Sequence, residues 1–327
     1  MSRRIGVLAM AYGTAGGTDD VERYYTDIRG GRPPTPQHLV DLKARYAAIG
    51  NRFPLLEITR AQGAGLEREL NRDEPGRFSV YLGMKHSAPF IADGVDRMRE
   101  DGIERAVGLV LAPHWSGMSV ESYVERVEKA LADAGAVGGP AFTYVRQWHD
   151  HPAFLDFLAA RVAGALEGLN QRARSGAAVV FSAHSLPTRA LPDGTIRCKT
   201  CDLCPDSCRY AAQLQETADG VAALLGLGDY TIGWQSAGRT TDPWWGPPVE
   251  DVIRDLAARG HPAVVVCSAG FVADHLEILY DLDIEARQVA EEAGIAFART
   301  EMPNDHPAFI RALAEVVREH LGEEAPR

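Results

Sequence analysis

Residues 178–185 read Ala-Val-Val-Phe-Ser-Ala-His-Ser, and this stretch contains a pattern that recurs along the chain. Its first part, Ala178–Phe181, is a short apolar run of the kind that forms a fully buried strand. Small and polar residues follow directly and lead to His184. Strands buried on both faces occur mainly in parallel sheets that helices cover. The stretch therefore predicts a parallel strand with a histidine at its carboxyl end.

The same pattern returns along the chain, with longer helical stretches between the runs. The eight runs are Ile5–Met10, Ser79–Gly83, Ala106–Ala112, Phe142–Val145, Ala178–Phe181, Tyr230–Trp234, Ala263–Cys267 and Ile295–Arg299. Strands that alternate with helices predict an α/β fold. Four runs in each half of a 327-residue chain predict two Rossmann-like, doubly wound domains, since single cores seldom exceed roughly 250–300 residues. We place these domains at residues 1–147 and 148–306, and a helix at 307–321 that could pack on the first.

The charge and the apolar runs limit the partners. The chain has 45 acidic and 34 basic side chains, a net charge of −11. Nucleic acid is not expected as a partner, because phosphate binding needs a basic face. No apolar run reaches the ~20 residues of a membrane helix, and the N-terminus lacks a signal-peptide pattern. We expect a cytoplasmic monomer without stable membrane insertion.

Histidine, aromatic or small polar residues follow six of the eight predicted strands. These loops come after Met10, Gly83, Ala112, Phe181, Trp234 and Cys267. In open α/β sheets, ligands bind outside the carboxyl ends of the strands. Two facing domains would therefore place these loops around one cleft. None of the loops has a GxGxxG or Walker A sequence, so nothing supports a nucleotide site.

A row of carboxylates follows the seventh run. We predict a helix over residues 272–293, which places Glu277, Asp281 and Glu285 at i, i+4 and i+8 on one face. Like charges at this spacing destabilise a helix by roughly 0.2–0.5 kcal/mol per pair unless cations compensate them. Carboxylate oxygens suit hydrated divalent metals. An acidic, solvated helix face is the alternative interpretation.

His184 is the second candidate. A neutral imidazole can accept a proton near pH 7 and can bind Fe(II). The alternative is a core histidine whose ring bonds to the backbone. His86 and His114 also follow strands and rank second, while His275 stands near the start of the acidic helix as a candidate partner.

Four of the five cysteines lie within residues 198–208, in the sequence CKTCDLCPDSC. The C-x2-C-x2-C-x3-C spacing of Cys198, Cys201, Cys204 and Cys208 predicts a metal-binding loop in a reducing compartment. The spacing does not separate [2Fe–2S], [4Fe–4S] and zinc. Disulfides would need an oxidising compartment. Cys267 is interpreted as a small buried apolar residue.

Several motifs together extend over nearly the whole chain. They are MAYGT at 10–14, ERYYTDIR at 22–29, DLKARY at 41–46, GMKH at 83–86, SAHSLP at 182–187, WQS at 234–236, and the stretch 270–285. In these motifs the chain resembles the ferrochelatase family, most closely its Gram-positive type that acts on coproporphyrin III. The resemblance implies two Rossmann-like domains with a porphyrin cleft between them.

The resemblance also implies roles for particular residues. His184 and Glu277 become the catalytic pair that faces the centre of the macrocycle. The implied substrate-binding residues are Tyr12, Arg29, Arg45, Tyr46 and Tyr123. Asp281 and Glu285 become an outer divalent-cation site, for iron or Mg²⁺, on the route to Glu277. The cysteine segment 198–208 resembles an insertion that binds [2Fe–2S]. Phe53 and Gly30 depart from the family, because a serine and a second arginine would stand there.

The sequence thus predicts an enzyme that inserts Fe(II), its metal substrate, into coproporphyrin III to give coproheme in haem biosynthesis. In this hypothesis His184 takes the pyrrole protons, and Glu277 receives iron and passes protons outward along the acidic row. The alternatives are a protoporphyrin IX ferrochelatase, a chelatase for another metal such as cobalt, and a haem-binding or iron–sulfur carrier protein without turnover.

Overall fold

The computed structural model describes residues 4–135, 138–199, 209–238 and 240–322. All eight predicted runs form strands, with ends that differ from the prediction by a few residues. The strands are β1 (Ile5–Ala11), β2 (Phe78–Met84), β3 (Arg105–Val110), β4 (Ala141–Val145), β5 (Ala178–His184), β8 (Tyr230–Gln235), β9 (Ala263–Cys267) and β10 (Ala296–Arg299).

The strands form two parallel sheets with the same topology. The orders are β2-β1-β3-β4 and β10-β9-β5-β8, and all neighbouring strands in both sheets pair in parallel. In each sheet the first strand is central, its successor lies on one side, and the third strand lies on the other. This reversal is the mark of a doubly wound sheet, so the predicted fold class is confirmed.

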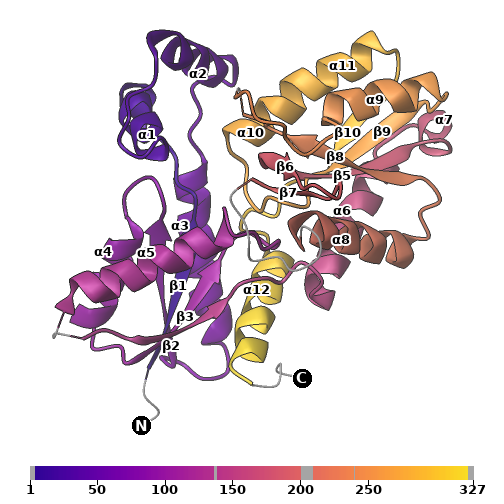
Figure 1. The fold of residues 1–327 in the computed structure, drawn as a ribbon. Helices are drawn as coiled ribbons and strands as arrows, with labels where there is room; N and C mark the ends of the chain where they lie inside the picture. Colours follow the sequence, from indigo (N-terminus) through magenta and orange to yellow (C-terminus); the bar gives the residue numbers. More distant parts are fainter. Residues whose placement is uncertain (1–3, 136–137, 200–208, 239, 323–327) are drawn as a thin grey trace.

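Helices cover both faces of the first sheet. The helices that pack on it are α3 (Leu55–Leu70), α4 (Ile91–Glu100) and α5 (Val120–Asp133). The helices α1 (Val21–Ile28), which follows the 3₁₀ turn η1 (Thr18–Asp20), and α2 (Pro36–Ala48) stand beyond the end of the sheet (Figure 1) and pack against Leu276 and Leu279 of the second half. Leu82 of β2 packs on Gly63 of α3, whereas the next residue, Gly83, lies against Ile91 of α4. Neighbouring residues of a strand point to opposite faces, so α3 and α4 cover opposite sides.

The second sheet is covered in the same way. Its helices are α6 (Pro152–Glu167), α7 (Gln171–Arg174), α8 (Arg209–Leu225), α9 (Val249–Ala258), α10 (Leu276–Leu279) and α11 (Arg287–Glu292), with a π-helical segment η3 (Asp281–Ala286) between the last two. Trp234 of β8 packs on Tyr210 of α8, and its neighbour Gly233 lies against Val249 of α9. The helices α8 and α9 therefore lie on opposite faces.

The helix α12 (Pro307–His320) connects the two halves. It packs against α3 of the first half and α6 of the second, and Figure 1 shows it between them. A single cluster of buried side chains runs through both sheets and includes Leu8, Phe181 and Phe309. The helix predicted at 307–321 is thus present, but it packs on both halves. The division into domains 1–147 and 148–306 stays a prediction.

The predicted helix over residues 272–293 is wrong at its start and in its middle. Residues 272–275 are not helical, because Asp274 N bonds to the side chain of Asn304, 2.8 Å away, and His275 is extended. The helix begins at Leu276, and after Tyr280 it widens into η3, where Glu285 N bonds to the Tyr280 carbonyl.

A short hairpin was also absent from the sequence prediction. It consists of β6 (Thr188–Ala190) and β7 (Ile196–Cys198), which pair antiparallel. Within the described residues, no helix is both long and apolar enough to cross a membrane.

Candidate functional site

The candidate residues gather where the strand order reverses. The loop after β1 carries Tyr12, β5 ends at His184, and the loop after β9 leads to Glu277. Gly270 lets this last loop lie directly on β5, because a Cβ there would come within 2.5 Å of the Ala183 Cβ. Its amide bonds to the Ser182 carbonyl at 3.0 Å. The two central strands therefore deliver His184 and Glu277 to the same point.

The ring of His184 has a fixed orientation. Its Nδ1 lies against the Ser185 carbonyl. A carbonyl only accepts, so Nδ1 carries a proton and the neutral ring presents the lone pair of Nε2. The hydroxyl of Tyr210 donates to the His184 carbonyl at 2.9 Å. Phe271 and Trp244 flank the ring, with centroids at 6.3 and 6.5 Å.

Glu277 lies between two imidazoles. One carboxylate oxygen is 3.7 Å from His184 Nε2, and the other is 3.6 Å from His275 Nε2. Burial alone would raise the pKa of Glu277, but the charge that His184 carries when protonated, the hydrogen bond and charge of His275, and the charge of Arg45 outweigh it and lower the pKa to about 2. The carboxylate therefore stays ionised at neutral pH, and its oxygens are available to a cation.

His275 is the partner of this carboxylate. Its Nδ1 donates to the Ala273 carbonyl at 2.9 Å, which leaves Nε2 towards Glu277. Burial lowers the pKa of His275, but its interaction with the Glu277 carboxylate outweighs burial and raises the pKa above the ordinary value. The sequence placed His275 near the acidic helix, and the structure shows which carboxylate it faces.

The three carboxylates of the row have different surroundings. Asp281 is buried and forms an ion pair with Arg45 of α2, and it also accepts a hydrogen bond from Ser236. Burial raises the pKa of Asp281 to about 6 although Arg45 opposes the shift. Glu277 is partly exposed and Glu285 is exposed. The cation that compensates the middle carboxylate in this structure is an arginine of the first half.

Tyr12 lies on the first-half side of the site and is 43 % exposed. Backbone pairing between the ends of β1 and β2 continues through the bond of His86 N to the Tyr12 carbonyl, and the two rings lie in contact at a tilt of 58°, with centroids 4.6 Å apart. His86 Nδ1 is 2.6 Å from the Asp27 carboxylate. Lys85 Nζ lies 5.3 Å from the Tyr123 ring and is 2.5 Å from the Ser122 hydroxyl. Burial, aided by the charge of Arg126, lowers the pKa of Lys85 to about 8.

Of the other predicted substrate-binding residues, Arg29, Arg45 and Tyr46 lie on α1 and α2 or directly after them, and Tyr123 lies on α5. Tyr46 is buried and stacks on Phe53 with centroids 4.4 Å apart, so the aromatic replacement at position 53 gives packing in place of a polar contact. Arg29 follows the end of α1, with its guanidinium 5.8 Å from the Tyr25 ring. Tyr123 of α5 is also buried.

The cysteine segment is only partly described. Cys198 is buried at the end of β7, whereas Cys201, Cys204 and Cys208 lie outside the described residues. Among the described residues, no three ligand-type side chains are grouped so that they could hold a metal ion. Cys267 is fully buried in β9, as predicted, and burial raises the pKa of its thiol to about 12.

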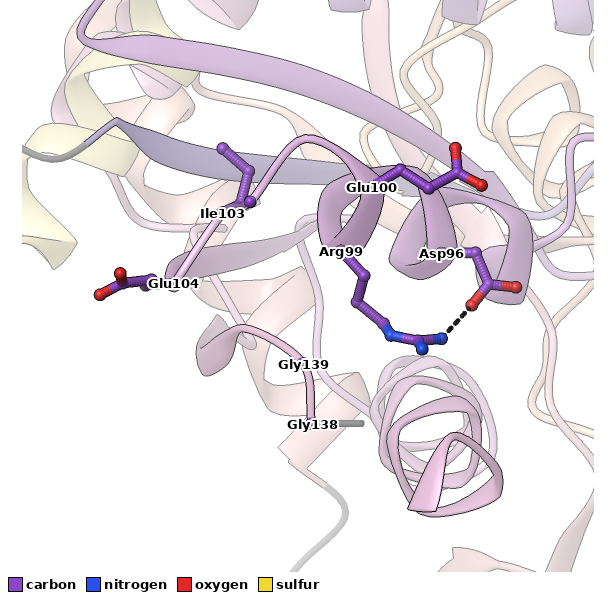
Figure 2. A pocket seen from close by; sticks show the side chains of 8 residues that line it. Asp96, Arg99, Glu100, Ile103, Glu104, Gly138 and Gly139 are labelled. Atoms are coloured by element: carbon purple, nitrogen blue, oxygen red, sulfur yellow. Dashed lines mark hydrogen bonds and ion pairs between the residues drawn. The ribbon is translucent and has the colours of Figure 1, made fainter. Parts of the chain in front are cut away.

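A surface hollow at another place is a weaker candidate. Figure 2 shows it beside the end of α4, lined by Asp96, Arg99, Glu100 and Glu104 among others. Glu104 directly precedes β3, so the hollow lies at the amino end of that strand. Ligands of open α/β sheets bind at the carboxyl ends, and Arg99 is already paired with Asp96 at 2.7 Å. We assign no function to this hollow.

Some residues of the site did not stand out in the sequence. Trp244, beside His184, lies in a loop between two prolines, where only the adjacent Trp244–Trp245 pair marked it. Ser236 was part of a quoted motif, but its bond to Asp281 joins residues 45 positions apart. The pairing of Arg45 with Asp281 spans 236 positions, and no local pattern announces it.

Comparisons with known proteins agree with this geometry. The chain is 45 % identical over 325 residues to the coproporphyrin III ferrochelatase of Bacillus subtilis strain 168, covering 98 % of this chain and all of the relative. It is 46 % identical to the enzyme of the same name from Geobacillus kaustophilus strain HTA426, covering 100 % and 99 %.

A solved structure supports the fold alone. The sirohydrochlorin chelatase SirB from Bacillus subtilis, solved with Fe³⁺, matches with a TM-score of 0.57 at 11 % identity and covers 97 % of this chain and 95 % of its own. The sequence profile described as Ferrochelatase matches residues 4–321. Together with the full-length relatives, this match shows that the chain belongs to the ferrochelatase family.

Proposed function

We propose that this chain inserts Fe(II) into coproporphyrin III. The observation that carries the proposal is the pairing of His184 Nε2 with the Glu277 carboxylate, 3.7 Å apart, at the point where the second sheet reverses its order. The substrate is taken from the names of the full-length relatives. Iron is here a substrate and leaves with the product.

His184 is proposed as the proton acceptor. Insertion removes two pyrrole protons, and an acceptor works best when a lone pair is already aimed at the proton. The Ser185 carbonyl holds the Nδ1 proton of His184, so Nε2 is the accepting atom. Phe271 and Trp244 beside the ring supply flat apolar surface for a macrocycle.

Glu277 is proposed as the residue that receives iron. Its carboxylate stays ionised because His184 and His275 lower its pKa, and ionised oxygens bind a hydrated divalent cation. Glu285 at the surface and Asp281 below it are proposed as the outer cation site, for iron or Mg²⁺. In this route Asp281 binds a cation only when Arg45 turns away, for example to a substrate carboxylate.

The cysteine segment has a separate proposed role. Four thiolates at the spacing of Cys198, Cys201, Cys204 and Cys208 favour a [2Fe–2S] cluster, with [4Fe–4S] and zinc as alternatives. Purified protein should be brown, and Cys204→Ser should bleach it. Metal analysis that finds one zinc and neither iron nor acid-labile sulfide would exclude both clusters.

The experiment that tests the main proposal is an anaerobic steady-state assay with Fe(II). Coproporphyrin III and protoporphyrin IX are offered separately, and Co(II) replaces Fe(II) in a third series. We expect many turnovers and the highest kcat/KM with Fe(II) and coproporphyrin III. A higher kcat/KM with protoporphyrin IX would reassign the substrate, and a single stoichiometric turnover would identify a carrier protein.

A further inference from the structure

We propose that Arg299 is a positioning residue for metalation, because it ties the loop in front of Glu277 to the π-helical segment behind it. The inference rests on the proposed role of Glu277. Arg299 ends β10, and Glu277 lies on α10, so the two residues belong to different elements.

The guanidinium of Arg299 holds two carboxylates at once. Its Nε and Nη2 donate to the two oxygens of Asp283 at 2.6 and 2.9 Å. The same Nη2 donates to Asp274 at 3.1 Å. The side chain of Arg299 is only 15 % exposed, so water screens these ion pairs weakly. A two-oxygen contact also fixes direction, which a single bond does not.

Asp274 is fixed at its other atoms as well. Its second oxygen accepts from Asn304 Nδ2 at 2.8 Å, and its amide donates to Asn304 Oδ1 at 2.8 Å. Gln62 of α3 reaches across from the first half and donates to the carbonyls of Val272 and Asn304, each at 2.9 Å. The loop that enters α10 is therefore held from both halves of the molecule.

The span between Asp274 and Asp283 contains both Glu277 and Asp281. Arg299 bridges the two ends of this span. It binds Asp274, three residues before Glu277, and Asp283, two residues after Asp281. Loss of the Arg299 guanidinium would allow α10 to tilt against β5 and would leave Asp274 and Asp283 without their cation. A displacement of about 1 Å in a reacting group can cost roughly 10²-fold in rate.

The test compares Arg299→Gln with wild type. We expect kcat at saturating Fe(II) and porphyrin to fall about 10- to 100-fold, while the porphyrin Kd, measured by fluorescence quenching, changes less than about twofold. Arg287→Gln is the matched control, because Arg287 donates to the Asp283 carbonyl rather than to its carboxylate and lies exposed over Phe297. It should keep the wild-type kcat. An unchanged kcat in Arg299→Gln would overturn the proposal.

A double-mutant cycle separates positioning from general stabilisation. If Arg299 acts through Glu277, then Arg299→Gln added to Glu277→Gln causes no further loss of rate. Losses that multiply would overturn the proposal. A Glu277→Gln variant with wild-type turnover would instead remove the proposed function itself, so the two failures are distinguishable.

A further variant covers the case in which Arg299→Gln does not fold. Asp283→Asn removes the charge of Asp283 but keeps a hydrogen-bond acceptor for Arg299, and it leaves the ion pair between Arg299 and Asp274 in place. It should lower kcat below the wild-type value, with the porphyrin Kd unchanged. A folded Asp283→Asn with a raised Kd and normal kcat would contradict a positioning role.

Discussion

His184 and His275 both carry an Nδ1 proton against a backbone carbonyl, and both direct Nε2 to Glu277. Their surroundings nevertheless separate their roles. Glu277 raises the pKa of His275, so His275 supplies positive charge to the carboxylate. His184 ends a strand at the open side of the site and keeps a lone pair for the substrate. In the proposed mechanism His275 is therefore the counter-charge of Glu277 and His184 is the base.

We expect His184→Ala and Glu277→Gln each to reduce iron insertion by about 10²–10⁴-fold, the usual cost of losing an acid–base group. Porphyrin binding and thermal stability should stay close to wild type, because neither residue belongs to the buried apolar core. His320→Ala, on the exposed side of α12, is the control. Near-wild-type turnover in either variant would remove that residue from the mechanism.

The outer carboxylates should matter most when iron is scarce. Asp281→Ala and Glu285→Ala are expected to raise the KM for Fe(II) several-fold and to leave kcat nearly unchanged, since a relay raises the local metal concentration without making bonds. Glu291→Ala, an exposed carboxylate of α11, should change neither value. An equal loss of rate at all iron concentrations would contradict the relay.

Lys85 should make porphyrin affinity depend on pH, because we expect its ammonium to pair with a propionate of the substrate. Its pKa of about 8 means that the ammonium dominates below that pH and is lost above it. The Kd of coproporphyrin III, measured by fluorescence quenching from about pH 7 to about pH 9.5, should therefore rise through about 8. Lys85→Met should bind weakly at every pH, and Lys85→Arg should flatten the curve. A flat curve in the wild type would exclude Lys85 as a carboxylate partner.

At the scale of elements, the strands were predictable and the acidic helix was not. Runs such as Ala263–Cys267 are apolar at every position because both faces of the strand are buried, so the sequence alone identifies them. Residues 272–275 look equally helical, but distant Asn304 and Gln62 bind their backbone and delay the helix. The widening into η3 has no local sequence signal. Local patterns therefore predict an element when the burial of its own residues determines it, and they fail where side chains from distant segments bind its backbone.

Gly270 allows the loop after β9 to pack on β5, so its substitution should have a clear effect on stability. A Cβ there would meet the Ala183 Cβ at 2.5 Å and its Cα at 2.8 Å, so Gly270→Ala should destabilise the protein by about 1–3 kcal/mol and separate Glu277 from His184. Gly164→Ala on α6 meets nothing within 4 Å and should stabilise it by about 0.5–1 kcal/mol. Thermal unfolding and kcat check both variants. If Gly270→Ala and the wild type unfold at the same temperature, the close approach of Gly270 to Ala183 is refuted.

At the scale of the whole molecule, the first and second halves meet directly at the site. Tyr24 and Tyr46 from α1 and α2 share a buried cluster with Leu276 and Leu279 of α10. Arg45 and Asp281 add an ion pair across the same boundary. The sequence indicated that strand ends from both halves would face one cleft. It could not indicate which charges would pair, because those partners are far apart in the chain.

Arg29 and Arg45 should contribute more to the use of coproporphyrin III than to the use of protoporphyrin IX. Coproporphyrin III carries four propionates and protoporphyrin IX two, so Arg29→Ala combined with Arg45→Ala should lower kcat/KM for coproporphyrin III more than for protoporphyrin IX. Arg45→Ala also leaves Asp281 without its cation. Arg254→Ala, an exposed arginine on α9, is the control. Unchanged coproporphyrin III affinity in the double variant would contradict the assignment of both residues.

The placement of α12 has a consequence for how the protein is made. This helix follows both sheets in the chain, yet it buries Phe309, Leu313 and Val317 against α3 and α6, and Arg318 donates to the carbonyl of Glu69 at the end of α3. While the ribosome is still synthesising residues 300–320, the apolar side of α3 has no cover. We therefore expect a stage of synthesis in which the first half exposes this apolar surface of α3, and exposed apolar surface favours aggregation until α12 covers it.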